Sequence, residues 1–299
     1  MGSGRFELPT FASSRQLKEN HKHEGINVKE SHLKEYLAIR ELEGITLKHK
    51  KEMESFLVKY LQYVNYKIDK NLSLEYFKIL KDNYSVAYYK KNMYQILKFL
   101  SYLGVKWIND IKLPPYPEYK PKRLSKKNIE QTLRYFSNSP FYKQIKALIL
   151  LGATSGLRAE ELYQLTPDDI DLDNRIVYVK HNPKHGKTTK TGKSRITFFS
   201  RETQQALMDY LQFFNNGCKL KHLFGKVHIQ RLFRNAPLNV KDLRKFFSQE
   251  WERLNGSYAV KELLMGHSLK RSVDLQHYTY LDESDLKKIY DKVFGDYKI

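Results

Sequence analysis

The stretch that decides the fold reads "TSGLRAEEL", from Thr154 to Leu162. It follows the apolar helical run "FYKQIKALILL", and a second helical segment, "RAEELYQL", begins directly after Gly156 and Leu157. A glycine between two such segments marks a turn that ends the first helix. We therefore expect Arg158 to lie at the start of a short helix, immediately after that turn.

A β-hairpin is predicted downstream of this turn. The letters "DLDN" indicate a turn, "RIVYVK" and "RITFF" are typical of strands, and the loop "NPKHGKTTKTGKS" separates the two strands. The hairpin loop and its flanks hold six Lys or Arg residues between Lys180 and Arg195, and no acid. Ser200 is expected to cap the helix "RETQQALMDYLQFF", and helices fill the rest of the chain.

A proline-rich segment divides the chain upstream. "LPPYPEYKPKRLS", Leu113 to Ser125, holds four prolines and cannot form a helix or a central strand. We expect a tail at residues 1–25 that is disordered, a helical domain at 26–112, a linker at 113–124 and a second domain at 125–299. Ser125 is the expected N-cap of the next helix. Apolar residues recur at helical spacing in the first domain: Met53, Phe56, Leu57, Tyr60, Leu61 and Val64, then Val86, Tyr89, Met93, Ile96, Leu97 and Leu100.

The charge favours a polyanionic partner. The 299 residues include 53 Lys and Arg against 33 Asp and Glu, a formal net charge of +20. Such a surplus is typical of proteins that bind nucleic acid. The sequence has one cysteine, no apolar run long enough for a membrane span and no visible secretory signal. We expect a cytoplasmic protein without membrane contact, associated with the nucleoid when bound to DNA.

No cofactor and no metal are expected. The sequence contains neither a phosphate-binding glycine loop nor a cluster of metal-binding carboxylates, which argues against chemistry driven by ATP or a metal. His181 and His185 lie four residues apart, but a lysine-rich loop is a poor metal site.

Five short motifs in a fixed order resemble the catalytic domain of tyrosine recombinases, the phage-type integrases. They are "TSGLRAEEL", "GKSR", "KDLR", "MGHS" and "HYTYL". The family pattern is Arg, a hairpin Lys, His-x-x-Arg, Gly-His and Tyr. The resemblance implies a mainly α fold with a small β-hairpin or sheet (α+β), in which a helical core-binding domain and a catalytic domain form a C-shaped clamp around DNA.

The resemblance assigns roles that the chemistry of phosphodiesters makes necessary. Arg158 and Arg244 would hold the nonbridging oxygens, on which charge builds during attack. Tyr278 would attack phosphorus and form a 3′-phosphotyrosine. Lys193 would protonate the leaving 5′ oxygen, although Lys190 and Lys187 are alternatives. Two further residues complete the site: His267, which would donate a hydrogen bond to the phosphate, and Glu161, which would support the site without reacting.

Two positions depart from the family pattern. The chain has Lys241 where the family usually has histidine, and lysine acts first as a cation, so Lys241 is either a base or only a phosphate-binding group. Some archaeal virus and plasmid integrases also carry lysine here. Tyr278 stands eleven residues after His267 rather than the usual nine. Tyr280 is the alternative nucleophile, but the run "HYTYL" favours Tyr278.

The predicted function is a site-specific DNA recombinase, an integrase of an archaeal virus or plasmid. Its expected partners are double-stranded attachment sites, on which it would form a homotetramer from free monomers or dimers, without a small-molecule substrate. The alternatives are a type IB topoisomerase and a non-catalytic DNA-binding protein. A helix after Tyr278, "DESDLKKIYDKVFG", would pack on its own domain or on a neighbouring protomer. The predicted DNA contacts are Lys120, Lys122, Arg123, Lys187, Lys190 and Arg195.

The N-terminal letters "GSGRFELPTFASS" suggest a target. Phe6 and Glu7 can be encoded by TTC-GAA, the core of the T-loop in nearly all tRNA genes, and the neighbouring residues permit flanking stem sequence. The resemblance implies recombination within a tRNA gene, with the attachment site inside the integrase gene. We therefore expect this segment to be translated attachment-site DNA.

Overall fold

The structure is a computed structural model that describes residues 26–118, 120–212, 221–267 and 281–299. The chain divides into two compact units between Lys120 and Pro121. The predicted tail at 1–25 lies outside the described residues. None of the described helices is long and apolar enough to cross a membrane.

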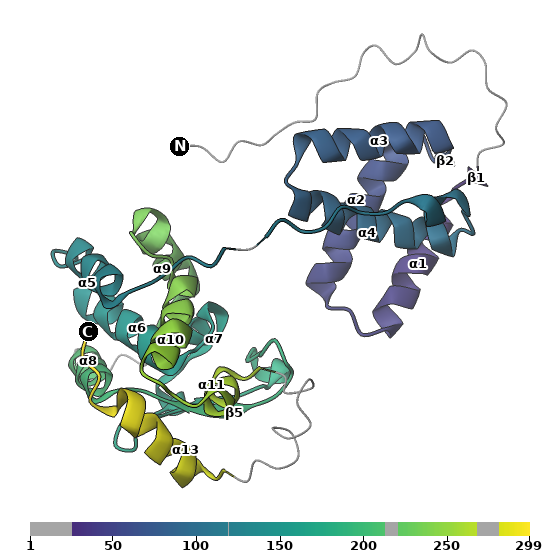
Figure 1. Ribbon diagram of the computed structural model, residues 1–299. Coiled ribbons are helices and arrows are strands. Elements are labelled where there is room, and N and C mark those ends of the chain that lie inside the picture. The colour runs from purple at the N-terminus through teal and green to yellow at the C-terminus, as the bar shows by residue number, and fades with distance from the viewer. Residues whose placement is uncertain (1–25, 119, 213–220, 268–280) are drawn as a thin grey trace. The chain divides into compact units, whose positions relative to one another are not determined.

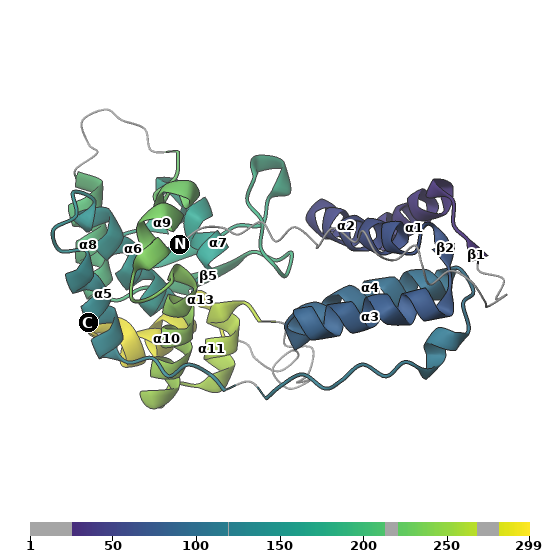
Figure 2. The same ribbon diagram turned by 90° about the horizontal axis from the view of Figure 1, so that it is seen from above.

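In its described residues, the first unit contains four α-helices and a short two-stranded ladder (Figures 1 and 2). Helix α2 packs against the other three helices. Thr46, Asp69 and Ser85 each accept a hydrogen bond from a backbone N–H in the first turn of the helix that follows, which fixes where α2, α3 and α4 begin. The elements are β1 (Ile26–Asn27), α1 (Glu30–Leu42), α2 (Leu47–Tyr63), β2 (Lys67–Ile68), α3 (Lys70–Asn83), α4 (Val86–Tyr102) and the 3-10 helix η1 (Trp107–Asp110).

The predicted helical stripes form the core of this unit, with one clear exception. All six residues of the stripe on α2 and its end are buried, as are Tyr89, Met93, Ile96 and Leu100 on α4. Val86 is 37% exposed. It is the first residue of α4, and the buried residues of this helix begin one turn later, at Tyr89. The ladder between β1 and β2 was not predicted, since two-residue strands leave no periodic signal.

The second unit is helical and contains a three-stranded antiparallel sheet in the order β3-β4-β5. The predicted hairpin is its β4-β5 pair, in which Val177 lies opposite Thr197. The third strand, β3, was not predicted. The elements are α5 (Lys126–Tyr135), α6 (Tyr142–Ser155), α7 (Ala159–Gln164), the 3-10 helices η2 (Pro167–Asp169), η3 (Pro183–His185) and η4 (Phe233–Asn235), β3 (Ile170–Asp171), β4 (Ile176–Val179), β5 (Arg195–Phe198), α8 (Arg201–Gln212), α9 (Lys226–Leu232), α10 (Val240–Arg253), α11 (Tyr258–Met265), α13 (Glu283–Tyr290) and the π-helix η5 (Asp291–Gly295).

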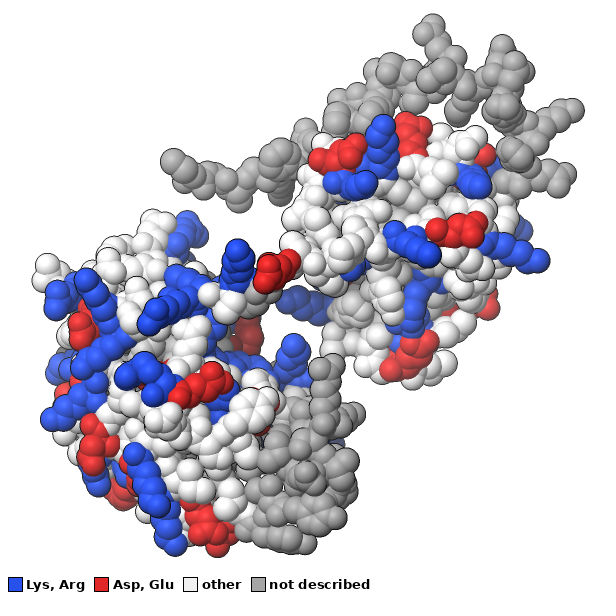
Figure 3. Space-filling model, viewed as in Figure 1, with Lys and Arg blue, Asp and Glu red and all other residues white. Residues whose placement is uncertain are grey.

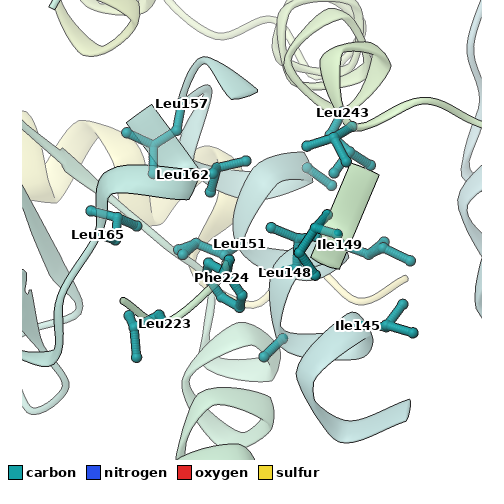
Figure 4. Packing of buried hydrophobic residues seen from close by; sticks show 14 of the residues in the cluster. Ile145, Leu148, Ile149, Leu151, Leu157, Leu162, Leu165, Leu223, Phe224 and Leu243 are labelled. Carbon is teal, nitrogen blue, oxygen red and sulfur yellow. The ribbon is translucent and has the colours of Figure 1, made fainter. Parts of the chain in front are cut away.

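Helix α6 is the centre of this unit, since nearly all of its last eleven residues are buried (Figure 4). It packs against α5, α7, α8, α10 and β5. A Cβ atom added at Gly152 would lie 2.7 Å from Cδ1 of Leu243, so the absence of a side chain lets α10 approach α6 closely. This contact places Arg244, the residue after Leu243, beside the turn that ends α6.

The C-terminal segment packs on its own domain, which is one of the two arrangements considered above. Tyr290 and Phe294 are fully buried in an aromatic cluster with Phe198, Phe247 and Trp251. The hydroxyl of Tyr290 donates a hydrogen bond of 2.7 Å to the carbonyl oxygen of Thr154. The last described segment is thereby joined to the turn that precedes Arg158.

Candidate active site

Arg158 lies where the sequence predicts, at the N-cap of α7. Gly156 ends α6 in the left-handed conformation, with φ of 67°, and so turns the chain into α7. The backbone N–H and Nη1 of Arg158 donate to the Glu161 carboxylate over 2.8 and 3.0 Å. Its Nη2 donates to the carbonyl oxygen of Gly266 over 3.3 Å, which joins α7 to the end of α11.

Glu161 is a buried carboxylate that binds two arginines at once. Nη1 and Nη2 of Arg195 donate to its two oxygens over 2.9 and 2.7 Å, in addition to the bonds from Arg158. Burial by itself raises the pKa of the Glu161 carboxyl, but the hydrogen bonds and charges of Arg195 and Arg158 outweigh this and hold the pKa below its ordinary value. Glu161 therefore stays ionised and fixes both guanidinium groups.

Arg244 joins the same cluster from α10. Its Nη1 donates to the carbonyl oxygen of Gly156 over 2.6 Å, and its Nη2 lies 2.8 Å from Nε2 of His267. Burial, with the positive charges of Arg158 and Arg195, lowers the pKa of the Arg244 guanidinium to about 9. The group remains charged at neutral pH, so two cations that are distant in sequence converge here.

His267 is held at the end of α11 by a glycine turn. Gly266 has φ of 64°, and a Cβ atom added there would lie 2.6 Å from Cδ of Arg195. Both the backbone conformation and the close approach of Arg195 therefore require glycine. Nδ1 of His267 lies 2.9 Å from each carboxylate oxygen of Glu262.

The hairpin lysines fall into two groups. Lys187 binds the buried carboxylate of Asp169 and also the hydroxyl of Thr166, while Lys180 binds the same carboxylate over 3.0 Å. Lys190 and Lys193 are exposed, and the backbone carbonyl of Lys193 accepts a hydrogen bond of 2.9 Å from Thr189, which closes the turn between them. Lys190 and Lys193 are thus exposed cations, whereas Lys187 anchors the hairpin to Asp169.

Two predicted site residues, both lysines, are not brought into the arginine cluster by any contact among the described residues. Lys193 and Lys241 are exposed, and within the described ranges neither side chain forms an ion pair with the cluster, although Lys241 lies one turn before Arg244. Tyr278 lies outside the described residues, as does the alternative Tyr280. Across the rest of the described chain, no group of three or more His, Cys, Asp and Glu side chains could hold a metal ion.

The predicted DNA contacts differ in exposure. Lys120, Lys122 and Arg123 are exposed, and Lys and Arg side chains gather on the visible faces of both units (Figure 3). Arg195 was predicted as a DNA contact from its place in the basic hairpin. Its side chain is only 10% exposed, and its donors bind Glu161 and the carbonyl oxygen of Leu264. The structure favours a supporting role for Arg195.

Sequence reasoning missed two carboxylates. Asp169 had a usable signal, because Thr166 and Asp169 have the spacing of a capping box, and Asp169 accepts from both the N–H and the hydroxyl of Thr166. Glu262 had none, because its role depends on the turn that folds His267 back over α11.

The chain is similar in sequence to known proteins. The model of the phage integrase family matches residues 122–283. The tyrosine recombinase XerC of Histophilus somni is 30% identical over 219 residues, which are 66% of this chain and 70% of the relative. The tyrosine recombinase XerA of Saccharolobus solfataricus is 29% identical over 196 residues, 64% of each chain.

Two solved structures share the fold. The structure of a lambda integrase dimer bound to a core site has a TM-score of 0.63 at 14% identity and covers 85% of this chain and 98% of its own. The Tn1549 transposon integrase in complex with circular intermediate DNA has a TM-score of 0.61 at 17% identity, with coverage of 86% and 97%. The mainly helical fold with a small sheet is thus confirmed.

Replacement of Glu161 by Gln is expected to lower the free energy of unfolding by about 3 kcal/mol, because two guanidinium groups lose a buried partner. Since the folded pKa lies below the usual 4.5, the stability that Glu161 contributes is present above pH 4.5 and is lost as the pH falls through the folded pKa. Denaturant unfolding across that range should show a smaller pH dependence in Glu161→Gln.

The matched control is Glu160→Gln, since Glu160 is exposed and binds only Lys226 among the described side chains. It should change stability by less than about 1 kcal/mol. Equal losses in the two variants would contradict the role given to Glu161.

Proposed function

The chain belongs to the phage integrase family and is an enzyme of the tyrosine recombinase class, and on that premise we propose that it is a site-specific DNA recombinase. It cleaves and rejoins DNA through a 3′-phosphotyrosine intermediate, as the integrase of an archaeal virus or plasmid. The observation that carries the proposal is the convergence of Arg158 and Arg244 on one site. Arg158 binds the buried Glu161 carboxylate and the carbonyl oxygen of Gly266, and Arg244 binds the carbonyl oxygen of Gly156.

The two arginines can bind a phosphodiester whose nonbridging oxygens gain negative charge during attack. Each guanidinium has five N–H donors in a planar fork, and the described contacts use only some of them. The remaining donors can bind the nonbridging oxygens of a phosphate. Because Glu161 and the turn carbonyls fix both groups beforehand, little reorganisation is needed when charge develops in the transition state.

The reacting groups are proposed from their places in the sequence. Tyr278 attacks phosphorus, and the bond to the 5′ oxygen breaks as Lys193 supplies the proton that this oxygen requires. The exposed position of Lys193 at a closed turn supports this role over Lys187, which is bound to Asp169. Lys241 adds positive charge next to Arg244, or acts as a base toward the tyrosine hydroxyl.

The partner is double-stranded DNA. The two solved structures described above are of recombinases bound to DNA, and this chain carries a charge of +20. We propose that both units together form a C-shaped clamp on the duplex and that four protomers hold two sites during strand exchange. Lys120, Lys122, Arg123 and Lys190 would contact the backbone of the DNA.

The target is a tRNA gene. The possible codons of Phe6 and Glu7 support this, because TTC-GAA would place the T-loop core within the gene of the recombinase itself. In that case the residues around Phe6 are constrained as DNA and not as protein. Integration would then divide the gene at the codons of Phe6 and Glu7.

Replacement of Tyr278 by Phe is expected to abolish the covalent protein–DNA complex, because no hydroxyl remains to attack phosphorus. The substrate is a nicked duplex that carries the site the protein footprints on its own element, so that cleavage is trapped. Tyr280→Phe is the matched control and should still form the complex. A covalent complex with Tyr278→Phe, or its loss only in Tyr280→Phe, would assign the nucleophile elsewhere.

Replacement of Lys193 by Ala is expected to slow single-turnover cleavage by about 10²- to 10⁴-fold, the usual contribution of a general acid. A substrate with sulfur in place of the bridging 5′ oxygen should restore the rate, since a thiolate leaves without a proton. Lys187→Ala, which only loosens the hairpin, should gain nothing from sulfur. Rescue of Lys190→Ala or Lys187→Ala instead would move the acid to that residue.

Two supercoiled plasmids distinguish a recombinase from a topoisomerase. One carries the coding DNA of residues 1–25, and the other carries a tRNA gene with the same T-loop core. We expect a joint product, detected by amplification across the junction, and its loss when Phe6 and Glu7 are recoded as TTT-GAG. Relaxation of both plasmids without a joint product would show a topoisomerase, and recombination that is insensitive to recoding would refute the target.

A further inference from the structure

Glu262 and His267 lie five residues apart in the sequence and are joined by a backbone contact and a side-chain contact. The backbone N–H of His267 donates to the carbonyl oxygen of Glu262 over 3.0 Å, which is the bond that closes a helix ending in a left-handed glycine. The same turn folds the imidazole back over α11, where Nδ1 meets the Glu262 carboxylate. The side chain of Glu262 is 15% exposed and that of His267 is 38% exposed, so the carboxylate is the more buried partner of this contact.

The partners of the imidazole determine which nitrogen carries the proton. A guanidinium has donors and no acceptor, so Nε2 of His267 accepts from Nη2 of Arg244. A carboxylate only accepts, so Nδ1 carries the hydrogen that Glu262 receives. Both contacts are satisfied together by one form of the neutral ring, with its proton on Nδ1.

Three arginines lie at the turn that holds His267. Arg244 approaches from α10, Arg158 donates to the carbonyl oxygen of Gly266, and the side chain of Arg195 packs against Gly266. Glu262, on α11, is the carboxylate that touches the ring. It also offsets the lowering of the pKa of Arg244 that burial and the other arginines cause.

We propose that Glu262 is a positioning residue that holds His267 in the Nδ1-protonated form, so that Nε2 orients the guanidinium of Arg244. The proposal rests on the proposed function, because it takes Arg244 as the group that binds the scissile phosphate. Glu262 thus acts on Arg244 indirectly, through its contact with His267. In this form Nε2 has no hydrogen, so His267 donates to a phosphate oxygen only after it takes up a second proton, whose charge Glu262 then balances.

The protonation form of His267 can be read directly by ¹⁵N NMR of the full chain labelled at histidine, with the His267 signals identified by their loss in His267→Asn. We expect the pattern of an Nδ1-protonated neutral ring in the wild type at pH values where the ring is neutral. Glu262→Gln keeps the shape of the side chain, but its amide both donates and accepts. It should therefore give a mixture of the two neutral forms. An unchanged Nδ1-protonated pattern in Glu262→Gln would overturn the proposal.

Single-turnover cleavage supplies the second readout. Glu262→Gln should slow cleavage by about 10- to 100-fold, the range known for carboxylates that orient metal-binding histidines, with little change in DNA affinity. Glu262→Asp keeps a carboxylate and should recover part of the rate. The matched control is Glu160→Gln, which changes the net charge equally at an exposed side chain of α7 and should cleave at the wild-type rate.

The outcomes separate this proposal from the proposed function. If the wild type cleaves DNA and Glu262→Gln cleaves equally fast, the positioning role fails while the function stands. If the wild type forms no covalent complex on any footprinted site, the function fails, and the NMR pattern still decides what Glu262 does to His267. Thermal unfolding of each variant excludes a loss of rate that is caused by unfolding.

Discussion

The ion pair that one buried carboxylate makes with two arginines is the interaction on which the site depends. Glu161 ties the start of α7 to β5 through Arg195, and it fixes Arg158 on its own helix. Three guanidinium groups this close repel one another, and burial removes the water that would screen them. A carboxylate that is itself almost fully buried compensates that repulsion without exposing the site to solvent.

The C-terminal ends of two helices supply the carbonyl groups that bind the two arginines. Gly156 ends α6 and Gly266 ends α11, both in the left-handed conformation. Arg244 donates to the carbonyl of Gly156, whereas Arg158, which follows Gly156 closely in sequence, donates to the carbonyl of Gly266. Carbonyl groups at a helix C-terminus carry partial negative charge, which suits a guanidinium. Arg244 thus depends on the turn that precedes Arg158, and Arg158 depends on the turn that precedes His267.

The sequence predicted the elements that have a recognisable local residue pattern and missed those that have none. The stripes on α2 and α4, the caps at Ser125 and Ser200 and the β4-β5 hairpin follow from local patterns that extend over many residues. The short strand β3 and the ladder between β1 and β2 depend on tertiary pairing and leave no such pattern. The order of the motifs predicted Arg158, Arg244 and His267 as one site, and the structure brings these three together.

Charge alone could not tell which basic residues face a ligand and which hold the fold. Arg195 and Lys187 come from the same basic hairpin as Lys190 and Lys193, yet they turn inward to Glu161 and Asp169. The buried carboxylates decide this division, and they lie outside the hairpin, in α7 and η2. Because these two acids bind Arg195 and Lys187, the hairpin is anchored without neutralising the positive charge of its exposed tip. A proton donor at such a tip retains the freedom to meet a leaving group while the site behind it stays fixed.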